Sequence, residues 1–459
     1  MKKLNIIAIM SAAVLMNSCG LYNKYERPDV ATDNIIRDAG QYANTTDTTS
    51  FGDVEWREVF TDPQLQALIQ QGLDKNHDLL NAALDVKMAE AQLMAARLAF
   101  LPSFAFTPSG TLSKVLEHGT EWSKAYALPV NASWNADLFG NLLSQNRSSK
   151  VALIATQDYQ QAVRSRVICG IANCYYTLLM LDRQYEILVE MEKLTKDTWD
   201  MMKLRKELSG ARETSVLSSE ASYLNVKAQV VDMRRQIHET ENTLSLLTGQ
   251  QAQSVTRGKL YDQNLPSTFS AGIPVNMLAN RPDIHAAEMS LAGCFYNVQT
   301  ARSAFYPALN FTATGSFTNS AAQIVNPGQF LARFVGSLTQ PIFQNGKLVA
   351  GLKVAKAQYE KAYNTWEQAI LAAGSEVSDA LVQYNSSDEK GKIDRQQVEV
   401  LKKNVSHTRD LFKMGSSTYL EVITAQSQLL NAEISQVTDD FNKMQAVVSL
   451  YSALGGGRK

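Results

Sequence analysis

The sequence contains one pattern twice, about 205 residues apart. The segment 96–102 (Ala-Arg-Leu-Ala-Phe-Leu-Pro) recurs at 301–307 as Ala-Arg-Ser-Ala-Phe-Tyr-Pro, and the same spacing pairs Gly110 with Gly315. Further along, Thr214 pairs with Thr418 at a spacing of 204. A repeat of this length indicates two copies of one supersecondary unit in a single chain. Any fold for this chain therefore has to place the same arrangement of helices and strands twice.

Each copy contains two segments in which apolar and small polar residues alternate. They predict strands at about 103–113 and 124–135 in the first copy, and at about 308–318 and 332–343 in the second. Strands of this length, with one apolar and one polar face, are typical of a membrane barrel, and a soluble hairpin packed on a helix is the alternative. Four strands cannot close a barrel, and lipid does not tolerate open strand edges. If these strands lie in a membrane, several chains must pool them.

Long helices follow the strands in both copies. Residues 140–208 contain no proline and one interior glycine, Gly170, and residues 346–414 form the equivalent stretch. After a turn, each copy returns along a helix with apolar residues at heptad spacing, which predicts a coiled-coil hairpin. The predicted seam positions are Val216, Ser219, Tyr223, Val226, Val230, Met233, Ile237, Thr240, Leu244 and Leu247, and then Leu420, Ile423, Ser427, Leu430, Ile434, Val437, Phe441, Met444, Val448 and Tyr451.

The N-terminus has the pattern of an export signal. Lys2 and Lys3 precede an apolar run over 4–16, which is too short to span a bilayer. The sequence Met-Asn-Ser-Cys at 16–19 resembles a bacterial lipoprotein cleavage box, which implies lipidation of Cys19; an ordinary signal peptide with an incidental cysteine is the alternative. The predicted organisation is a signal peptide (1–18), a lipidated extended segment (19–62), a first repeat (63–250), a linker (251–275), a second repeat (276–455) and a tail (456–459).

Composition argues against several classes of protein. The chain has 44 Lys and Arg against 45 Asp and Glu, a net charge of −1, so we expect no nucleic-acid partner. Its five histidines include no pair at zinc-protease spacing, and neither a phosphate loop nor a nucleophile elbow is present. We therefore expect no catalytic residues, no metal site and no cofactor.

Several motifs carry a family resemblance. Residues 273–288 (Ile-Pro-Val-Asn-Met-Leu-Ala-Asn-Arg-Pro-Asp-Ile-His-Ala-Ala-Glu) are similar to a signature of the TolC-like outer membrane factors, in their lipoprotein branch. The segments 301–307 and 341–348 (Pro-Ile-Phe-Gln-Asn-Gly-Lys-Leu) also fit that family. Within the signature, Arg281 and Asp283 suit an ion pair or a helix cap, which is a structural role.

The resemblance implies a mainly α-helical fold with a transmembrane β-barrel. Three chains would form a homotrimer with a twelve-stranded barrel in the outer membrane and a long periplasmic α-helical barrel. The implied function is a passive exit duct for small toxic compounds in a tripartite efflux pump. Its implied partners are a periplasmic adaptor, an inner-membrane RND-type pump and outer-membrane lipid. A duct for secreted protein (type I secretion) and a coiled-coil surface lipoprotein scaffold without a pore remain alternatives.

The same resemblance places a gate at the tips of the hairpins. Matching the family's Gly-x-x-Thr turn to 415–418 puts Glu421 at the position of a gate carboxylate, while Thr424 stands where the family has a second one. Three copies of Glu421 around an axis would favour cations and raise one another's pKa; a solvated surface carboxylate is the alternative. Glu213 and Glu220 are weaker gate candidates. The candidates for contact with the adaptor are Gly210, Arg212, Thr214, Gly415, Ser416 and Thr418.

Overall fold

The computed structural model describes residues 22–30, 51–114, 122–209, 212–266, 281–318 and 329–458. The predicted signal peptide and Cys19 lie outside these ranges, as do residues 267–275 of the predicted linker. The chain divides into two compact units. Four helices contribute residues to both units, and they are α5 (His77–Leu98), α6 (Asn141–Ser209), α9 (Pro282–Ser303) and α10 (Lys347–Lys413).

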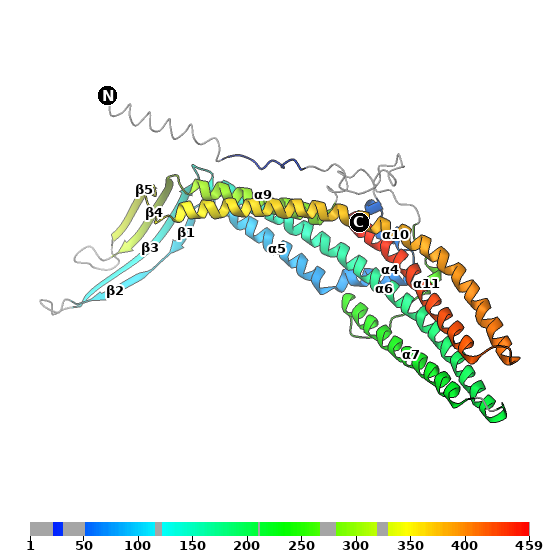
Figure 1. The fold of residues 1–459 in the computed structure, drawn as a ribbon. Coiled ribbons are helices and arrows are strands. Elements are labelled where there is room, and N and C mark those ends of the chain that lie inside the picture. The colour runs from blue at the N-terminus through cyan, green and yellow to red at the C-terminus, as the bar shows by residue number, and fades with distance from the viewer. Residues whose placement is uncertain are drawn as a thin grey trace. The chain divides into compact units, whose positions relative to one another are not determined.

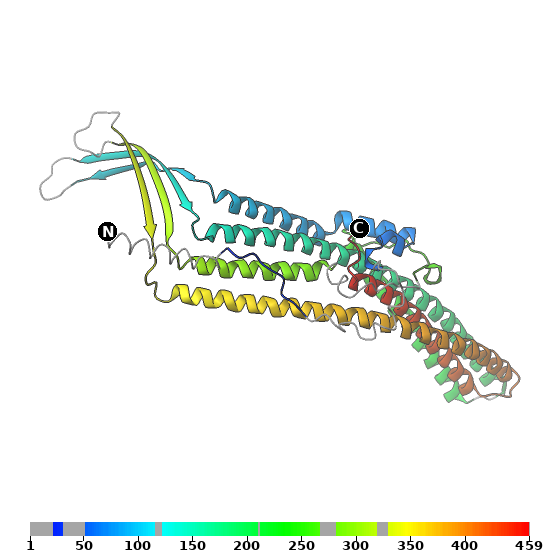
Figure 2. The same cartoon turned by 90° about the horizontal axis from the view of Figure 1, so that it is seen from above.

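The first unit contains one antiparallel sheet. Its strands are β1 (Ser103–Phe106), β2 (Ser109–Ser113), β3 (Ser123–Ala136), β4 (Ala308–Thr318) and β5 (Gln329–Thr339). Both β1 and β2 pair with β3, and β3 pairs with β4, which joins the two copies (Figure 2). Among the described residues, the outer edges of β1–β2 and of β5 have no strand beside them.

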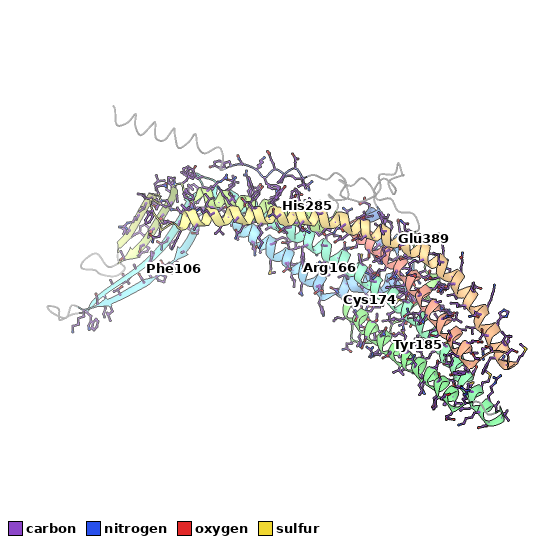
Figure 3. The ribbon with its side chains drawn as sticks, viewed as in Figure 1. Phe106, Arg166, Cys174, Tyr185, His285 and Glu389 are labelled. Carbon is purple, nitrogen blue, oxygen red and sulfur yellow. The ribbon has the colours of Figure 1, made fainter. Side chains whose placement is uncertain are left out.

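The two faces of the sheet differ as the alternation predicts. The exposed large apolar side chains of one face are Phe104, Phe106, Leu112, Leu128, Val130, Trp134, Phe311, Phe317, Phe330, Phe334 and Leu338. Phe106 is labelled on this sheet in Figure 3. On the opposite face, Asn131 donates to Thr107 Oγ1 at 2.9 Å and accepts from Thr314 Oγ1 at 2.8 Å. Within the described part of the chain, the apolar face therefore has no covering layer, while side chains of the polar face hydrogen-bond to one another.

Aromatic rings cover glycines on the apolar face. Phe311 lies opposite Gly336, and its ring is 3.5 Å from the position that a Cβ of Gly336 would take. Trp134 stacks on the other side of Phe311 with ring centroids 5.6 Å apart. A ring over a strand glycine restores packing that the missing side chain cannot provide.

Two strand predictions need correction at prolines. The strand expected over 103–113 is divided into β1 and β2 at Pro108, although Thr107 N still donates to Pro129 O at 3.2 Å. The strand expected over 332–343 begins earlier and ends at Thr339, shortly before Pro341. Proline has no N–H for the ladder and restricts the residue before it, so pairing stops there.

The N-terminal segment 22–30 lies along helices of the first unit. Arg27 donates from Nε to Glu288 Oε1 at 2.9 Å, and its guanidinium lies 6.0 Å from the centre of the Trp366 ring. Tyr296 packs in the same region, since its hydroxyl accepts from Tyr25 N at 3.3 Å. The Tyr-Glu-Arg-Pro motif at 25–28 therefore has a packing role in this unit.

The second unit contains two helical hairpins, α6 with α7 (Glu213–Leu247) and α10 with α11 (Tyr419–Ala453) (Figure 1). In α7, every predicted seam position is buried or half-buried. In α11, eight of the ten are, but Leu420 and Ser427 are exposed. The prediction is wrong at these two positions because a second stripe of α11, including Ala425 and Leu429, packs against α10 near the tip instead.

Short segments pack around the other end of these hairpins. They are η2 (Phe51–Asp53), α3 (Trp56–Val59), α4 (Pro63–Lys75) and η3 (Leu260–Asp262). Their largest apolar side chains are fully buried together with Tyr175, Tyr176 and Tyr451.

The family signature has a structural role in this unit. Arg281 is 8% exposed and donates to both oxygens of Asp283, at 3.0 and 2.7 Å. It also donates to Glu376 Oε2 at 2.6 Å and to the Ala453 carbonyl at 3.0 Å. One guanidinium therefore joins the start of α9 to α10 and to the end of α11, as the planar fork of arginine permits.

Over the described residues, none of the helices is both long and apolar enough for a membrane span.

Tyr451→Phe tests the polar contacts in the buried core. The Tyr451 hydroxyl donates to Val54 O and accepts from Gly457 N, both at 2.9 Å, and burial raises its pKa to about 12. Removing the oxygen keeps the ring but leaves two buried partners unsatisfied. We expect the free energy of unfolding in a urea titration to fall by about 1–3 kcal/mol. Tyr261→Phe, at a 55% exposed tyrosine, is the control, and an equal loss in both variants would contradict the expectation.

Candidate functional site at the hairpin tips

The candidate site residues lie where each hairpin turns. α6 ends at Ser209 and α7 begins at Glu213, whereas α10 ends at Lys413 and α11 begins at Tyr419 (Figure 1). Gly210 lies outside the described residues. Arg212, Thr214, Ser416 and Thr418 are exposed, so both turns present polar side chains to solvent.

Gly415 ends α10 in a Schellman motif. Its φ is +80°, and Ser416 N donates to Leu411 O at 2.9 Å while Gly415 N donates to Phe412 O at 3.1 Å. This arrangement satisfies carbonyls that have no partner within the helix, and a left-handed φ strongly favours glycine. The glycine therefore sets the direction in which the chain leaves α10.

Thr418 and Glu421 form a capping box at the start of α11. Glu421 N donates to Thr418 Oγ1 at 3.3 Å, and Thr418 N donates to the Glu421 carboxylate at 3.4 Å. Ser417 Oγ donates to the same carboxylate oxygen. These hydrogen bonds, with that of Ser417 the largest cause, lower the pKa of Glu421. Within one chain, Glu421 is thus a helix-capping carboxylate held ionised, whereas repulsion in a ring of copies would act on its pKa in the opposite direction.

The other candidate residues have separate environments. Thr424 is exposed one turn further along α11. Glu213 pairs with Lys206 of α6. Glu220 is half-buried on α7. Within the chain, the structure brings Thr418 together with Glu421 but does not bring the three glutamates together.

A small apolar cluster lies beneath both turns. Its buried members come from all four helices: Met202 of α6, Val216 of α7, Phe412 of α10 and Val422 of α11. Sequence reasoning did not identify this cluster, because heptad spacing pairs each helix with its own return helix and does not specify the packing of one hairpin on the other.

Two arginines join the hairpins at the same level. Arg205 of α6 donates to the Phe412 carbonyl at the end of α10, and its guanidinium lies 4.0 Å from the centre of the Phe412 ring. Arg409 of α10 pairs with Asp197 of α6 at 3.5 Å. A cation is favourable at a helix C-terminus, so Arg205 stabilises the end of a helix that belongs to the other hairpin. Sequence reasoning missed both residues.

The chemistry available at the tips is that of an exposed polar surface. Across the described ranges, no group of three or more His, Cys, Asp or Glu side chains is placed to hold a metal ion. Exposed carboxylates, hydroxyls and tight turns offer hydrogen bonds and charge. In the first unit, the exposed apolar face of the sheet is the kind of surface that the strands of a membrane barrel present to lipid.

Comparison with known proteins identifies the family. The profile of the family described as "Outer membrane efflux protein" matches residues 68–250 and 273–456. The chain therefore belongs to the outer membrane efflux protein family, and the resemblance found in the sequence is confirmed. It is an efflux channel protein of the outer membrane, and its mainly α-helical fold with strands for a barrel is that of TolC-like channels.

Similar proteins cover almost the whole chain. The cation efflux system protein CusC of Escherichia coli (strain K12) is 26% identical, over 97% of this chain and 98% of CusC. The toluene efflux pump outer membrane protein TtgC of Pseudomonas putida is also 26% identical, over 99% of this chain and 96% of TtgC. The crystal structure of the open state of the Neisseria gonorrhoeae MtrE outer membrane channel has a TM-score of 0.84 at 25% identity, covering 95% of this chain and 98% of that one.

Thr418→Ala tests the capping box. Loss of the hydroxyl removes the acceptor for Glu421 N, so the first turn of α11 should fray, at a cost of about 1 kcal/mol. Hydrogen exchange of peptides spanning 416–425 should accelerate about fivefold. Thr424→Ala, which removes a hydroxyl one turn later, should leave the exchange unchanged; acceleration in both variants would mean that the cap has no particular role.

Proposed function

We propose that three copies of this protein form the outer-membrane exit duct of a tripartite efflux pump. The duct conducts small toxic compounds passively from the periplasm to the exterior. The observation that supports this most strongly is the sheet, because it combines an exposed apolar face with two unpaired edges. Hydrocarbon offers no partner for edge N–H and C=O groups, so further copies must complete the sheet. Three copies, the number that the family resemblance implies, pool twelve strands.

The helices also present surfaces that suit a second copy. On α7, Leu217, Leu224 and Val231 recur every seven residues and are 54%, 52% and 62% exposed. On α10, Ile393 and Val400 are 59% and 65% exposed at the same spacing. Apolar stripes at heptad spacing pack against other helices. In a trimer, each hairpin would gain a neighbour from the next copy and the hairpins would form a continuous helical wall.

The proposed partners follow from this placement. The segments that join α6 to α7 and α10 to α11 dock a periplasmic adaptor, with Gly210, Arg212, Thr214, Gly415, Ser416 and Thr418 as contact candidates. The adaptor joins the duct to an inner-membrane RND-type pump. Lipid on Cys19 anchors the N-terminus to the outer membrane.

The duct needs selectivity but no catalysis. The relatives named for cations and for toluene are equally identical to this chain, so identity does not choose between these classes. The polar face of the sheet would line the barrel with the hydrogen-bonding groups of Thr107, Asn131 and Thr314 and with the cation of Arg333, which lies opposite Thr314. We propose that this protein is not an enzyme and binds no cofactor.

Native mass in mild detergent and conductance in a planar bilayer test the proposal together. A particle of three chains that conducts ions is expected. A stable monomer would overturn pooled strands, and a trimer with no conductance under any condition would favour the scaffold alternative.

Glu421→Gln tests the gate. Glutamine can keep the capping box, since its carbonyl oxygen accepts from Thr418 N, but it removes the charge. We expect higher resting conductance and a severalfold loss of cation preference in bilayer recordings. Glu399→Gln, an exposed carboxylate within α10, is the control. Unchanged conductance and selectivity in Glu421→Gln would reject a carboxylate ring.

The internal repeat gives a register for the seam between copies. In the β3–β4 ladder, Val130 lies opposite Gly315. The equivalent residues at repeat spacing are Phe334 on β5, which is 84% exposed, and Gly110 on β2, beside which a Cβ would meet nothing within 4 Å. We expect β5 of one copy to pair with β1–β2 of the next so that Phe334 covers Gly110, as Phe311 covers Gly336 within the chain.

Disulfide trapping tests this register. In a background with the native cysteines replaced, Ala332→Cys combined with Leu112→Cys should give covalently linked trimers after oxidation, because these positions would lie opposite each other. The pair Phe334→Cys and Leu112→Cys, displaced by two residues, should link poorly. At repeat spacing, the β1–β3 and β4–β5 pairings of the chain differ in register by two residues. Preferential linking of Phe334→Cys with Leu112→Cys would therefore assign a register between copies that is shifted by two residues.

A further inference from the structure

The interface between α10 and α11 is charged, unlike the mainly apolar seam of α7. Ion pairs cross it at successive turns: Lys443 with Asp388, Lys390 with Asp439, Arg395 with Asp440, and Lys402 with Glu433. All lie on the stretch of α10 that contains Glu389, labelled in Figure 3, or on the facing part of α11. Among these carboxylates, Asp439 is the most buried.

Asp439 has one oxygen without a donor. The residue is 3% exposed, and its Oδ1 accepts from Lys390 Nζ at 2.9 Å. Its Oδ2 is fully buried and receives no hydrogen bond from any described residue. A buried carboxylate oxygen without a donor costs a large part of its hydration energy, so an unseen donor is expected at this position.

Asp394 on α10 lies beside Asp439 across the interface, because Lys390, one turn before Asp394, pairs with Asp439, and Ser435, one turn before Asp439 on α11, donates to Asp394. Asp394 is 9% exposed and accepts from Ser435 Oγ at 3.4 Å. Two ionised carboxylates side by side are both acceptors and repel each other. A proton on one of them allows an O–H···O⁻ hydrogen bond between them, which is short and strong.

We propose that Asp394 and Asp439 hold one proton between them, and that this shared proton fastens α11 to α10 in the middle of the hairpin. The donor that Asp439 Oδ2 lacks is then the hydroxyl of a neutral Asp394. Lys390 balances the single remaining negative charge.

The surrounding groups leave the second charge of an ionised pair unbalanced. Arg395 is engaged with Asp440 at 3.1 Å, and α6 contributes neutral Gln184, which donates to Thr438 Oγ1 at 3.1 Å. Other charged and titratable groups of this region are Asp388, Glu389, Lys392, Lys402, Glu433, Lys443, Arg183 and Tyr261.

The repeat itself does not require an acidic pair here. At a spacing of 204, the residues equivalent to Asp394 and Asp439 are Glu190 and Arg235. Both are exposed, and Arg235 pairs with Glu239 at 2.9 Å on its own helix. The pair of buried carboxyls is therefore specific to the α10–α11 hairpin.

The direction of the pH effect follows from the proton. Burial, and then the neighbouring Asp439 carboxylate, raise the pKa of Asp394 above its ordinary value. The folded hairpin holds a proton that the unfolded chain releases at lower pH. The contact through the shared proton is therefore fully formed below the ordinary pKa of aspartate. Its contribution to the stability of the hairpin is lost as pH rises through the raised pKa of Asp394. Acid should tighten this hairpin and alkali should loosen it.

Asp394→Asn tests the shared proton between Asp394 and Asp439 in the full-length protein. The asparagine Nδ2 can donate to Asp439 at every pH. After correction for the intrinsic pH dependence of amide exchange, hydrogen exchange of peptides covering 388–400 and 433–445 should therefore no longer depend on pH. Wild-type protein should exchange about tenfold faster, after the same correction, above the raised pKa than below it. Glu399→Gln, an exposed carboxylate on the same helix, should behave as wild type.

Infrared spectroscopy gives a second, independent measurement. Wild-type protein should show the carbonyl stretch of a protonated carboxyl at a pH where ordinary aspartates are ionised, and both Asp394→Asn and Asp439→Asn should lose it. A spectrum without that band, or corrected wild-type exchange that is independent of pH, would overturn the proposal. Both measurements test only the proton shared by Asp394 and Asp439, so their outcome does not depend on the proposal that the protein is an exit duct. Only a pH effect on conductance would rest on the proposed function.

Discussion

Backbone hydrogen bonding at the edges of the sheet is the constraint on which the rest of the structure depends. In the described chain, β1–β2 and β5 each leave a row of N–H and C=O groups without a strand beside them. In hydrocarbon each such group costs several kcal/mol, so strands that lie in the outer membrane require neighbouring copies. Phe334 is almost fully exposed beside the β5 edge, so its apolar ring also requires a neighbouring copy to pack against. The apolar stripes on α7 and α10 extend this requirement along the helices.

The two hairpins share one ancestry but differ in their seams. α7 buries its heptad positions, and Val226, Val230 and Leu244 belong to the main core. α11 shares that core further along, but it is also joined to α10 by ion pairs, with Asp394 and Asp439 buried among them. Apolar packing hardly responds to pH or salt, whereas charged contacts respond to both. The duplication therefore combines a hairpin with a mainly apolar seam and one whose seam is charged.

Much of the fold could be predicted from periodicity. Alternation over 308–318 identified β4 with its observed bounds, and the absence of proline identified α6 and α10 to within one residue of each end. The heptads failed only at Leu420 and Ser427, where α11 packs on α10 through a different stripe. At the tips, spacing alone could have found the capping box, since Thr418 and Glu421 stand three residues apart. Arg205 could not be found in this way, because its partner is the Phe412 carbonyl, which carries no sequence signal.

The sequence by itself determined the duplication, the alternating strands, the long helices and the family, because these are local periodicities or motifs that can be read directly from the order of the residues. Only the tertiary structure decided which groups meet across long separations. It placed Arg281 between α9, α10 and α11, ended β5 at Thr339, and buried Asp394 and Asp439 at one level of the α10–α11 interface. Such contacts depend on the rotation and register of packed helices, and a shift of one residue, which leaves composition and spacing nearly unchanged, turns a side chain by about 100°.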